Sequence, residues 1–315
     1  YLSSGISTLS IVDMAYLYPV NIVILLITKL FQNVLLLFPF YMFSIYLHLI
    51  VGSFFVYKIL SKYFNLDRFQ SLFGALIWTF IGFNTEWFSA GQVLITASYL
   101  PICFYFSLNM MKEGSFKNYV TYYVSTALSF LAGYTMVAAI IYGVCVFYRI
   151  LMLKKINDPG LTKFVMSEIK GILFIVFPII LPVYVNSVVI FSLSIRSLLN
   201  IDSFLVYSTR VIDLFESIFP RNTLFNTESK NNIVYLYLSL VGLIVLFESQ
   251  NIKSVMKVKR NLIIGLIGIL ALLVSLGKVT PLAGWLFYLL PGFNFFRRIS
   301  IFSLLTGFSF CLLIP

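Results

Sequence analysis

The chain has 315 residues, of which 60% are hydrophobic and 10% are charged, with a formal net charge of +11 and a mean hydropathy of +0.99. Soluble domains carry about 25% charged residues, so this composition excludes an ordinary soluble protein. The apolar runs lack the alternating polar face of a barrel strand, and several exceed the roughly 17 residues that cross hydrocarbon as a helix. We therefore expect an all-α integral membrane protein, a polytopic helical bundle that forms one membrane domain over residues 1–315. The positive charge suits anionic lipid and membrane topology and gives no argument for nucleic acid.

The apolar runs predict about nine spanning helices. In chain order they lie near 34–57, 69–84, 93–110, 118–132, 134–152, 171–193, 233–249, 261–277 and from 300 to the end. A single helix over 118–152 would be about 52 Å long, against a hydrocarbon core of roughly 30 Å, so Gly133 is predicted to mark a turn between two short spans. The shorter runs 20–31 and 281–290 are predicted to be interfacial or re-entrant helices, tethered by Lys29 and Trp285.

The two ends of the chain predict a fragment. The first residue is Tyr1 rather than Met, and Pro315 interrupts an apolar run. We therefore expect a piece of a longer polytopic protein, truncated at both ends.

The basic residues divide unequally between the two sides of this arrangement. One side holds fourteen: Lys58, Lys62, Arg68, Lys112, Lys117, Arg149, Lys154, Lys155, Lys163, Lys170, Lys253, Lys257, Lys259 and Arg260. The other holds eight: Lys29, Arg196, Arg210, Arg221, Lys230, Lys278, Arg297 and Arg298. The positive-inside rule makes the first side cytoplasmic. The long segments 1–33, 194–232 and 278–299 are therefore predicted to lie together on the outer face.

Arginines on this outer face are candidate phosphate ligands. Arg297 and Arg298 follow the loop Leu290-Pro-Gly-Phe-Asn-Phe-Phe, and guanidinium groups beside an interface suit phosphate. The alternative is that the pair anchors the next helix in the headgroup layer. Further candidates for the same clamp are Arg196, Arg221 and its neighbour Asn222. The stretch 206–219 between them has helical apolar spacing, which indicates a surface-lying connector or a lid over a lipid-substrate groove.

A few other polar residues suit catalysis or sugar binding. Asp13 is the only acid in the first outer segment, where it serves either as a general base or metal ligand or as a helix cap. Glu86 and Gln92 flank Trp87 in a short outer loop, where they contact a sugar or face solvent as turn residues. His48 lies inside a spanning run, where a structural hydrogen bond is favoured over catalysis.

The sequence predicts no metal centre of the cysteine or histidine type. His48 is the single histidine, and three cysteines lie far apart inside apolar runs without a metal or redox spacing. Cys103, Cys145 and Cys311 are therefore predicted to be small apolar core residues.

The order of these segments resembles bacterial YfhO-like membrane proteins of the GT-C-type glycosyltransferase superfamily. The resemblance covers nearly the whole chain and is strongest from Thr280-Pro281 through Leu290-Pro-Gly292 to Arg297. Its other parts are Gly5 to Pro19, Leu47-His48 with Gly52 and Tyr57, Pro101, Leu131-Ala-Gly-Tyr134, Arg196, Pro220-Arg-Asn222, and Tyr235 with Gly242. Tyr134 stands where relatives often carry His after the glycine, which departs from the family pattern.

The resemblance implies a GT-C-like fold in the bacterial cytoplasmic membrane, with its active face outside the cytoplasm. Such an enzyme takes a sugar from a polyprenyl-phosphate donor and transfers it to a cell-envelope glycopolymer or glycolipid, such as lipoteichoic acid. An acid in the first outer loop acts as base or helps to bind a divalent metal, and Asp13 is the candidate here.

Two other classes of protein fit the same composition. A transporter or flippase for lipid-linked saccharides should show broken helices, inverted repeats and charges buried at mid-membrane depth, whereas nearly all charges here cluster near predicted span ends. A noncatalytic assembly protein would need none of the outer charges.

Overall fold

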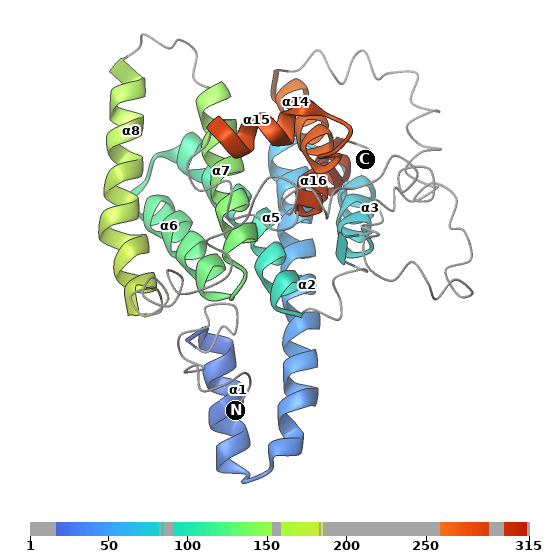
Figure 1. Cartoon of the computed structure of the whole chain (residues 1–315), viewed down its shortest axis with the longest axis vertical. Coiled ribbons are helices and arrows are strands. Elements are labelled where there is room, and N and C mark those ends of the chain that lie inside the picture. Colours follow the sequence, from blue (N-terminus) through green and yellow to red (C-terminus); the bar gives the residue numbers. More distant parts are fainter. Residues whose placement is uncertain are drawn as a thin grey trace, which may run out of the picture. The chain divides into compact units, whose positions relative to one another are not determined.

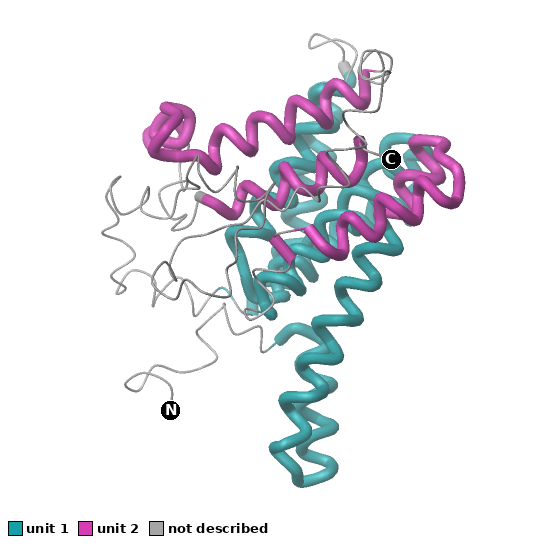
Figure 2. The backbone as a smooth tube through the Cα atoms, turned by 90° about the vertical axis from the view of Figure 1, so that its right-hand side faces the viewer, with its two compact units in different colours: residues 1–55, 90–194 teal, residues 56–89, 195–315 magenta. Residues whose placement is uncertain are grey.

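The computed structural model describes residues 17–81, 83–84, 91–152, 159–182, 184, 259–289 and 299–313, and every element in these ranges is helical. The chain forms two compact units. Unit 1 comprises Tyr1–Phe55 and Ala90–Ser194, and unit 2 comprises Val56–Ser89 and Ile195–Pro315 (Figure 2).

Unit 1 begins with a helical hairpin. Helix α1 (Pro19–Leu30) starts on a proline at its first position, and a short 3-10 turn (Val34–Leu36) leads into α2 (Leu37–Tyr63), whose first part runs antiparallel to α1 (Figure 1). Gln32 in the connection has a positive φ of 50°, and the Asn33 side chain accepts a hydrogen bond from the Leu35 amide at 3.0 Å. This side-chain contact caps the turn that reverses the chain.

The core of unit 1 is built from α5 (Gly91–Glu113), α6 (Phe116–Leu131) and α7 (Thr135–Met152), which pack on one another. The turn between α6 and α7 contains Gly133 at φ 105°, a conformation that side-chain-bearing residues rarely adopt. The predicted division of 118–152 into two helices at this glycine is therefore confirmed.

Helix α8 (Pro159–Gly171) packs on α6, and its axis continues through a π-helical turn over Ile172–Val176. A side chain at Gly171 would overlap the ring of Tyr123, so glycine allows α6 and α8 to approach closely there. The Tyr184 hydroxyl donates to Thr135 Oγ1 at 3.0 Å. Because this pair joins the end of the α8 segment to the start of α7, the two helices run antiparallel.

Unit 2 contains the end of α2, α3 (Arg68–Thr79), α14 (Lys259–Ser275), α15 (Pro281–Leu289), a 3-10 turn (Ile299–Phe302) and α16 (Ser303–Leu313). Its main contact is between α14 and α16. A methyl group added to Gly268 would lie 2.7 Å from Ser309 Cβ, and Thr306 Oγ1 donates to the Gly268 carbonyl at 3.2 Å. Small residues and one interhelical hydrogen bond thus hold this pair together, as is common in membrane helices.

Four helices in the described ranges are long and apolar enough to cross a membrane: Val34–Tyr63, Gly91–Glu113, Thr135–Met152 and Gly160–Pro182. Large apolar side chains also cover their outsides, including Phe38 (71% exposed) and Phe174 (76%). Lipid solvates such a surface well, whereas water does not. The expected class, an all-α membrane protein, is therefore confirmed within these ranges.

The predicted spans differ from the helices in length and position. Those near 69–84, 118–132, 261–277 and 300 to the end fall on α3, α6, α14 and α16, which have 12, 16, 17 and 11 residues. The span predicted over 171–193 overlaps the apolar helix Gly160–Pro182, which begins eleven residues earlier, and its residues from 185 on lie outside the described residues. The predicted span 233–249 and the outer segment 194–232 lie outside the described residues, so the total of nine stays a prediction.

Candidate functional site

Of the candidate site residues, only Gln92 lies in the described ranges. It is half-buried in the first turn of α5, and its backbone carbonyl accepts a hydrogen bond from Thr96 Oγ1 at 2.8 Å. It lies at the opposite end of α5 from Lys112, as the predicted topology requires. Outside the described residues lie Asp13, Glu86, Arg196, Arg221, Asn222, Arg297 and Arg298.

A buried ion pair between α7 and α8 is the main polar feature of unit 1. Arg149 Nη1 lies 2.7 Å from Glu168 Oε1, and the two side chains are 2% and 9% exposed. Removing both charges from water carries a large cost, which only close contact and further hydrogen bonds offset. A pair this buried is therefore expected to depend on the groups around it.

Those surrounding groups come from four helices of unit 1. The Arg149 guanidinium donates from Nη2 to the Tyr122 hydroxyl at 3.0 Å and from Nε to the Cys145 carbonyl at 3.3 Å, and Nη1 lies 3.8 Å from Met110 Sδ. Its carbon also lies 4.5 Å from the centre of the Tyr122 ring and 5.2 Å from that of Phe164. One side chain thus contacts α5, α6, α7 and α8.

The Glu168 carboxylate is less completely satisfied than its partner. Its Oε2 accepts a hydrogen bond from the Tyr142 hydroxyl at 2.8 Å. Its Oε1 has the close charge contact with Arg149 but no hydrogen bond of good geometry within the described residues. The cluster formed by Arg149, Glu168, Tyr122 and Tyr142 thus pairs one positive with one negative charge, and the two tyrosine hydroxyls contact the pair. We call it the ion-pair cluster.

Sequence reasoning missed this cluster. From the sequence, Arg149 is counted with the basic loop residues of the predicted cytoplasmic side, whereas the structure places it in the last turn of α7 with its side chain buried. The signal in the sequence was weak and consisted of two facts: Arg149 lies in a long apolar run, and Glu168 is the only acid between residues 159 and 184. A basic residue in one apolar helix and a single acid in the next are typical of an intramembrane pair.

A second buried cluster of unit 1 joins the start of α1 to α2 and α5. His48 Nδ1 lies 2.6 Å from the Ser44 carbonyl, which can only accept, so this nitrogen carries the proton. In a neutral imidazole Nε2 then accepts from the Tyr18 hydroxyl, whose oxygen in turn accepts from Tyr99 at 2.8 Å. The prediction that His48 makes a structural hydrogen bond is confirmed. We call these residues the histidine cluster.

The cysteines behave as the sequence predicts. Cys103, Cys145 and Cys311 are all buried and free. In the described ranges, no group of three His, Cys, Asp or Glu side chains lies close enough together to hold a metal ion.

The first half of the segment 277–298 forms a tight connection in unit 2. Gly277 has a φ of 27°, the Val279 amide donates to the Leu276 carbonyl at 2.9 Å, and Thr280 Oγ1 donates to the Leu273 carbonyl. Pro281 then begins α15, which lies against the end of α14 through Ala283. The conformation of this turn is thus fixed by local hydrogen bonds, whereas the arginines that follow at 297 and 298 lie outside the described residues.

The described helices define an all-helical membrane protein with two buried polar clusters in unit 1. No protein-family model, curated protein or solved structure matches this chain.

Proposed function

We propose that the chain is part of a membrane glycosyltransferase that transfers a sugar from a polyprenyl-phosphate donor to a cell-envelope acceptor on the outer face of the membrane. The observation that carries the proposal is the paired Arg297 and Arg298 after a Pro-Gly loop, in a segment that the count of basic residues predicts to lie on the outer face. Long apolar helices with lipid-compatible exteriors support it, because they suit a lipid-linked substrate.

The proposed chemistry assigns a task to each group. A lipid-linked donor enters between helices while its phosphate stays at the interface, where the arginines neutralise charge that develops on the leaving phosphate. Asp13 is the proposed base that accepts the proton of the acceptor hydroxyl. Glu86 and Gln92 are the proposed sugar contacts.

The arginine pair gives the test. Purified Arg297→Ala and Arg298→Ala variants should lose about 100-fold or more of the transfer of radiolabelled sugar from undecaprenyl phosphate, because a removed charge-stabilising donor typically costs that much. Lys278→Ala, a basic residue of the same predicted outer segment, is the matched control and should retain activity. If both arginine variants are expressed normally in the membrane and transfer sugar at the wild-type rate, Arg297 and Arg298 do not bind the phosphate.

The second candidate, a transporter of lipid-linked saccharides, gains one specific observation. The ion-pair cluster places Glu168 inside the apolar helix Gly160–Pro182, and buried charges of this kind are common in transporters. Under this alternative, Glu168→Gln would abolish movement of a fluorescent lipid-linked sugar across a vesicle membrane. Under the first proposal the same variant should alter stability without creating or removing such movement.

A further inference from the structure

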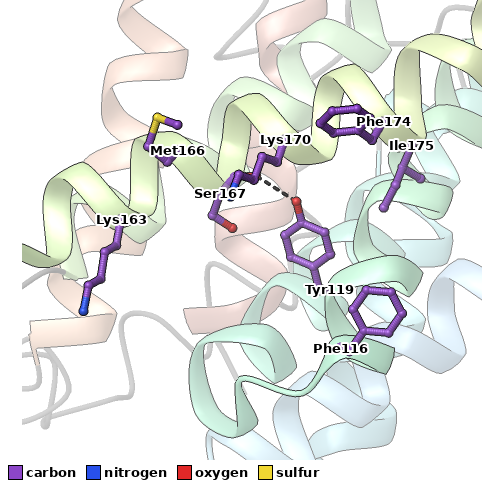
Figure 3. A pocket seen from close by; sticks show the side chains of 8 residues that line it. All are labelled: Phe116, Tyr119, Lys163, Met166, Ser167, Lys170, Phe174 and Ile175. Carbon is purple, nitrogen blue, oxygen red and sulfur yellow. Dashed lines mark hydrogen bonds between the residues drawn. The ribbon is translucent and has the colours of Figure 1, made fainter.

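A groove on the surface of unit 1 combines basic and apolar side chains. It has a volume of about 580 Å³ and lies between α6 and α8 (Figure 3). Its lining residues are Phe116 and Tyr119 of α6 together with Lys163, Met166, Ser167, Lys170, Phe174 and Ile175 of the α8 segment. This volume lies within the range of about 300 to 1,000 Å³ that small-molecule sites occupy.

The charge of the groove is entirely positive. Lys163 and Lys170 are exposed and seven residues apart, so they lie on the same face of α8, about 10 Å apart along its axis. The groove has no acidic lining residue, and neither lysine forms an ion pair with the part of the chain that the structure describes. Glu168, the acid that lies on α8 itself, is buried and paired with Arg149. Nothing described in the groove therefore neutralises the two ammonium groups.

The apolar part of the groove is equally exposed. Phe116 and Phe174 are 79% and 76% exposed, and Met166 is 48% exposed. The Tyr119 hydroxyl is already used, because it donates to the Ser167 carbonyl at 2.9 Å, which fixes α6 against α8 beside the groove (Figure 3). The Gly171 contact with Tyr123 further along α8 holds the same two helices together. The two helices that form the groove are thus held against each other, and its aromatic side chains are exposed.

We propose that this groove binds one anionic phospholipid, with the headgroup phosphate at Lys163 and Lys170 and an acyl chain along Phe116 and Phe174. The groove belongs to a helix long and apolar enough to span the bilayer, so lipid is the solvent of its apolar wall. Lysine side chains on such a helix extend toward the interface, where phosphate lies. The predicted topology puts these lysines on the cytoplasmic side, whose leaflet carries the anionic lipids that attract basic segments.

The same phosphate chemistry has two sources, a lipid headgroup and free phosphate, and the experiment separates them. The full chain is purified in mild detergent and titrated with dioleoyl phosphatidylglycerol, and native mass spectrometry counts the bound lipid. Wild type should hold one phosphatidylglycerol in preference to dioleoyl phosphatidylcholine. Each lysine should contribute about fivefold to affinity, so Lys163→Ala with Lys170→Ala should weaken binding by roughly 25-fold.

Three controls make the result decisive. Lys117→Ala removes an exposed lysine of α6 that does not line the groove and should leave lipid binding unchanged. Lys163→Arg with Lys170→Arg keeps the charge and should retain binding, which guards against a folding defect in the alanine variant. Phe174→Ala should weaken binding of phosphatidylglycerol but leave binding of inorganic phosphate unchanged, because only the lipid has an acyl chain that contacts Phe174.

Two outcomes would overturn the proposal. One is equal retention of phosphatidylglycerol by wild type and by the double alanine variant. The other is binding of inorganic phosphate alone as tightly as the lipid, which would assign the lysines to a free anion. Neither outcome bears on the arginine clamp, because the sugar-transfer assay of Arg297 and Arg298 is read separately.

Discussion

Two helix pairs in this chain are held together by opposite means. In unit 1, α7 and α8 meet through the buried pair of Arg149 and Glu168, surrounded by hydroxyl groups and aromatic rings. In unit 2, α14 and α16 meet through small residues, with Gly268 against Ser309. The first contact depends on satisfied charge, and the second depends on close approach.

Both kinds of contact suit helices that are surrounded by lipid. Lipid gives helices no hydrophobic reason to associate, so contact must come from packing or from polar groups that find no partner in lipid. A small-residue contact tolerates loss of a polar atom but not added volume. An ion pair tolerates some change of volume but not the loss of one charge.

The largest effect is expected from Glu168→Ala. This change leaves the Arg149 guanidinium buried without its counter-charge, and such losses cost about 3–5 kcal/mol. Reversible unfolding in mixed micelles, followed by circular dichroism, measures the free energy of unfolding. A loss below about 1 kcal/mol would contradict the claim that the ion-pair cluster joins four helices.

The double variant Arg149→Met with Glu168→Met sharpens this prediction. It removes both charges together and keeps apolar volume, a change that is often neutral in buried pairs. Its loss of unfolding free energy should therefore be much smaller than that of Glu168→Ala. A loss in the double variant as large as that of Glu168→Ala would contradict the claim that the cost comes from leaving Arg149 without its counter-charge.

A smaller loss is expected from Gly268→Ala in unit 2. The new methyl group would lie 2.7 Å from Ser309 Cβ, and overpacking of this kind costs about 1–3 kcal/mol. Gly143→Ala is the matched control, because a side chain at that helical position meets no atom within 4 Å. The control should gain about 0.5–1 kcal/mol from reduced backbone freedom. If the two alanine variants have the same thermal midpoint, α14 and α16 are not in close contact.

The smallest effect is expected from Tyr18→Phe in the histidine cluster. It removes the hydroxyl between His48 and Tyr99 and leaves buried polar atoms without a partner, which costs about 1–2 kcal/mol. Tyr288→Phe is a control on α15, since Tyr288 is 72% exposed and its change should alter stability little. Thermal unfolding compares the two, and equal midpoints would exclude a stabilising role for the neutral cluster.

Sequence reasoning predicted those features that depend on local chain properties. Gly133 ends α6 because a positive φ excludes most residues, and apolar composition was sufficient to place Cys103 and Cys145 in the core. The start of the apolar helix at Gly160 was missed because Glu168 and Lys170 lower the local hydropathy. Glu168 is nevertheless accommodated, since Arg149 meets it from another helix. Such a partner is a tertiary contact, which hydropathy alone does not reveal.

Less of the candidate site than of the fold could be predicted from the sequence. Hydropathy and charge count assign side chains to one face of a membrane, but they do not give distances between them. The histidine cluster joins residues 30 and 81 positions apart, and no spacing in the sequence indicates that Tyr18 meets both His48 and Tyr99. Of the outer candidates, only Gln92 has a described position, so the others stay predictions.

We propose that this membrane protein transfers a sugar covalently to an acceptor rather than transporting a lipid-linked sugar across the bilayer. The direct measurement uses proteoliposomes that contain the purified chain, undecaprenyl phosphate linked to a radiolabelled sugar, and extracted lipoteichoic acid. We expect label to pass covalently to the acceptor, with Asp13→Asn reducing the rate as loss of a base would. Labelled donor that crosses the bilayer while the acceptor stays unlabelled would contradict this account and identify a transporter.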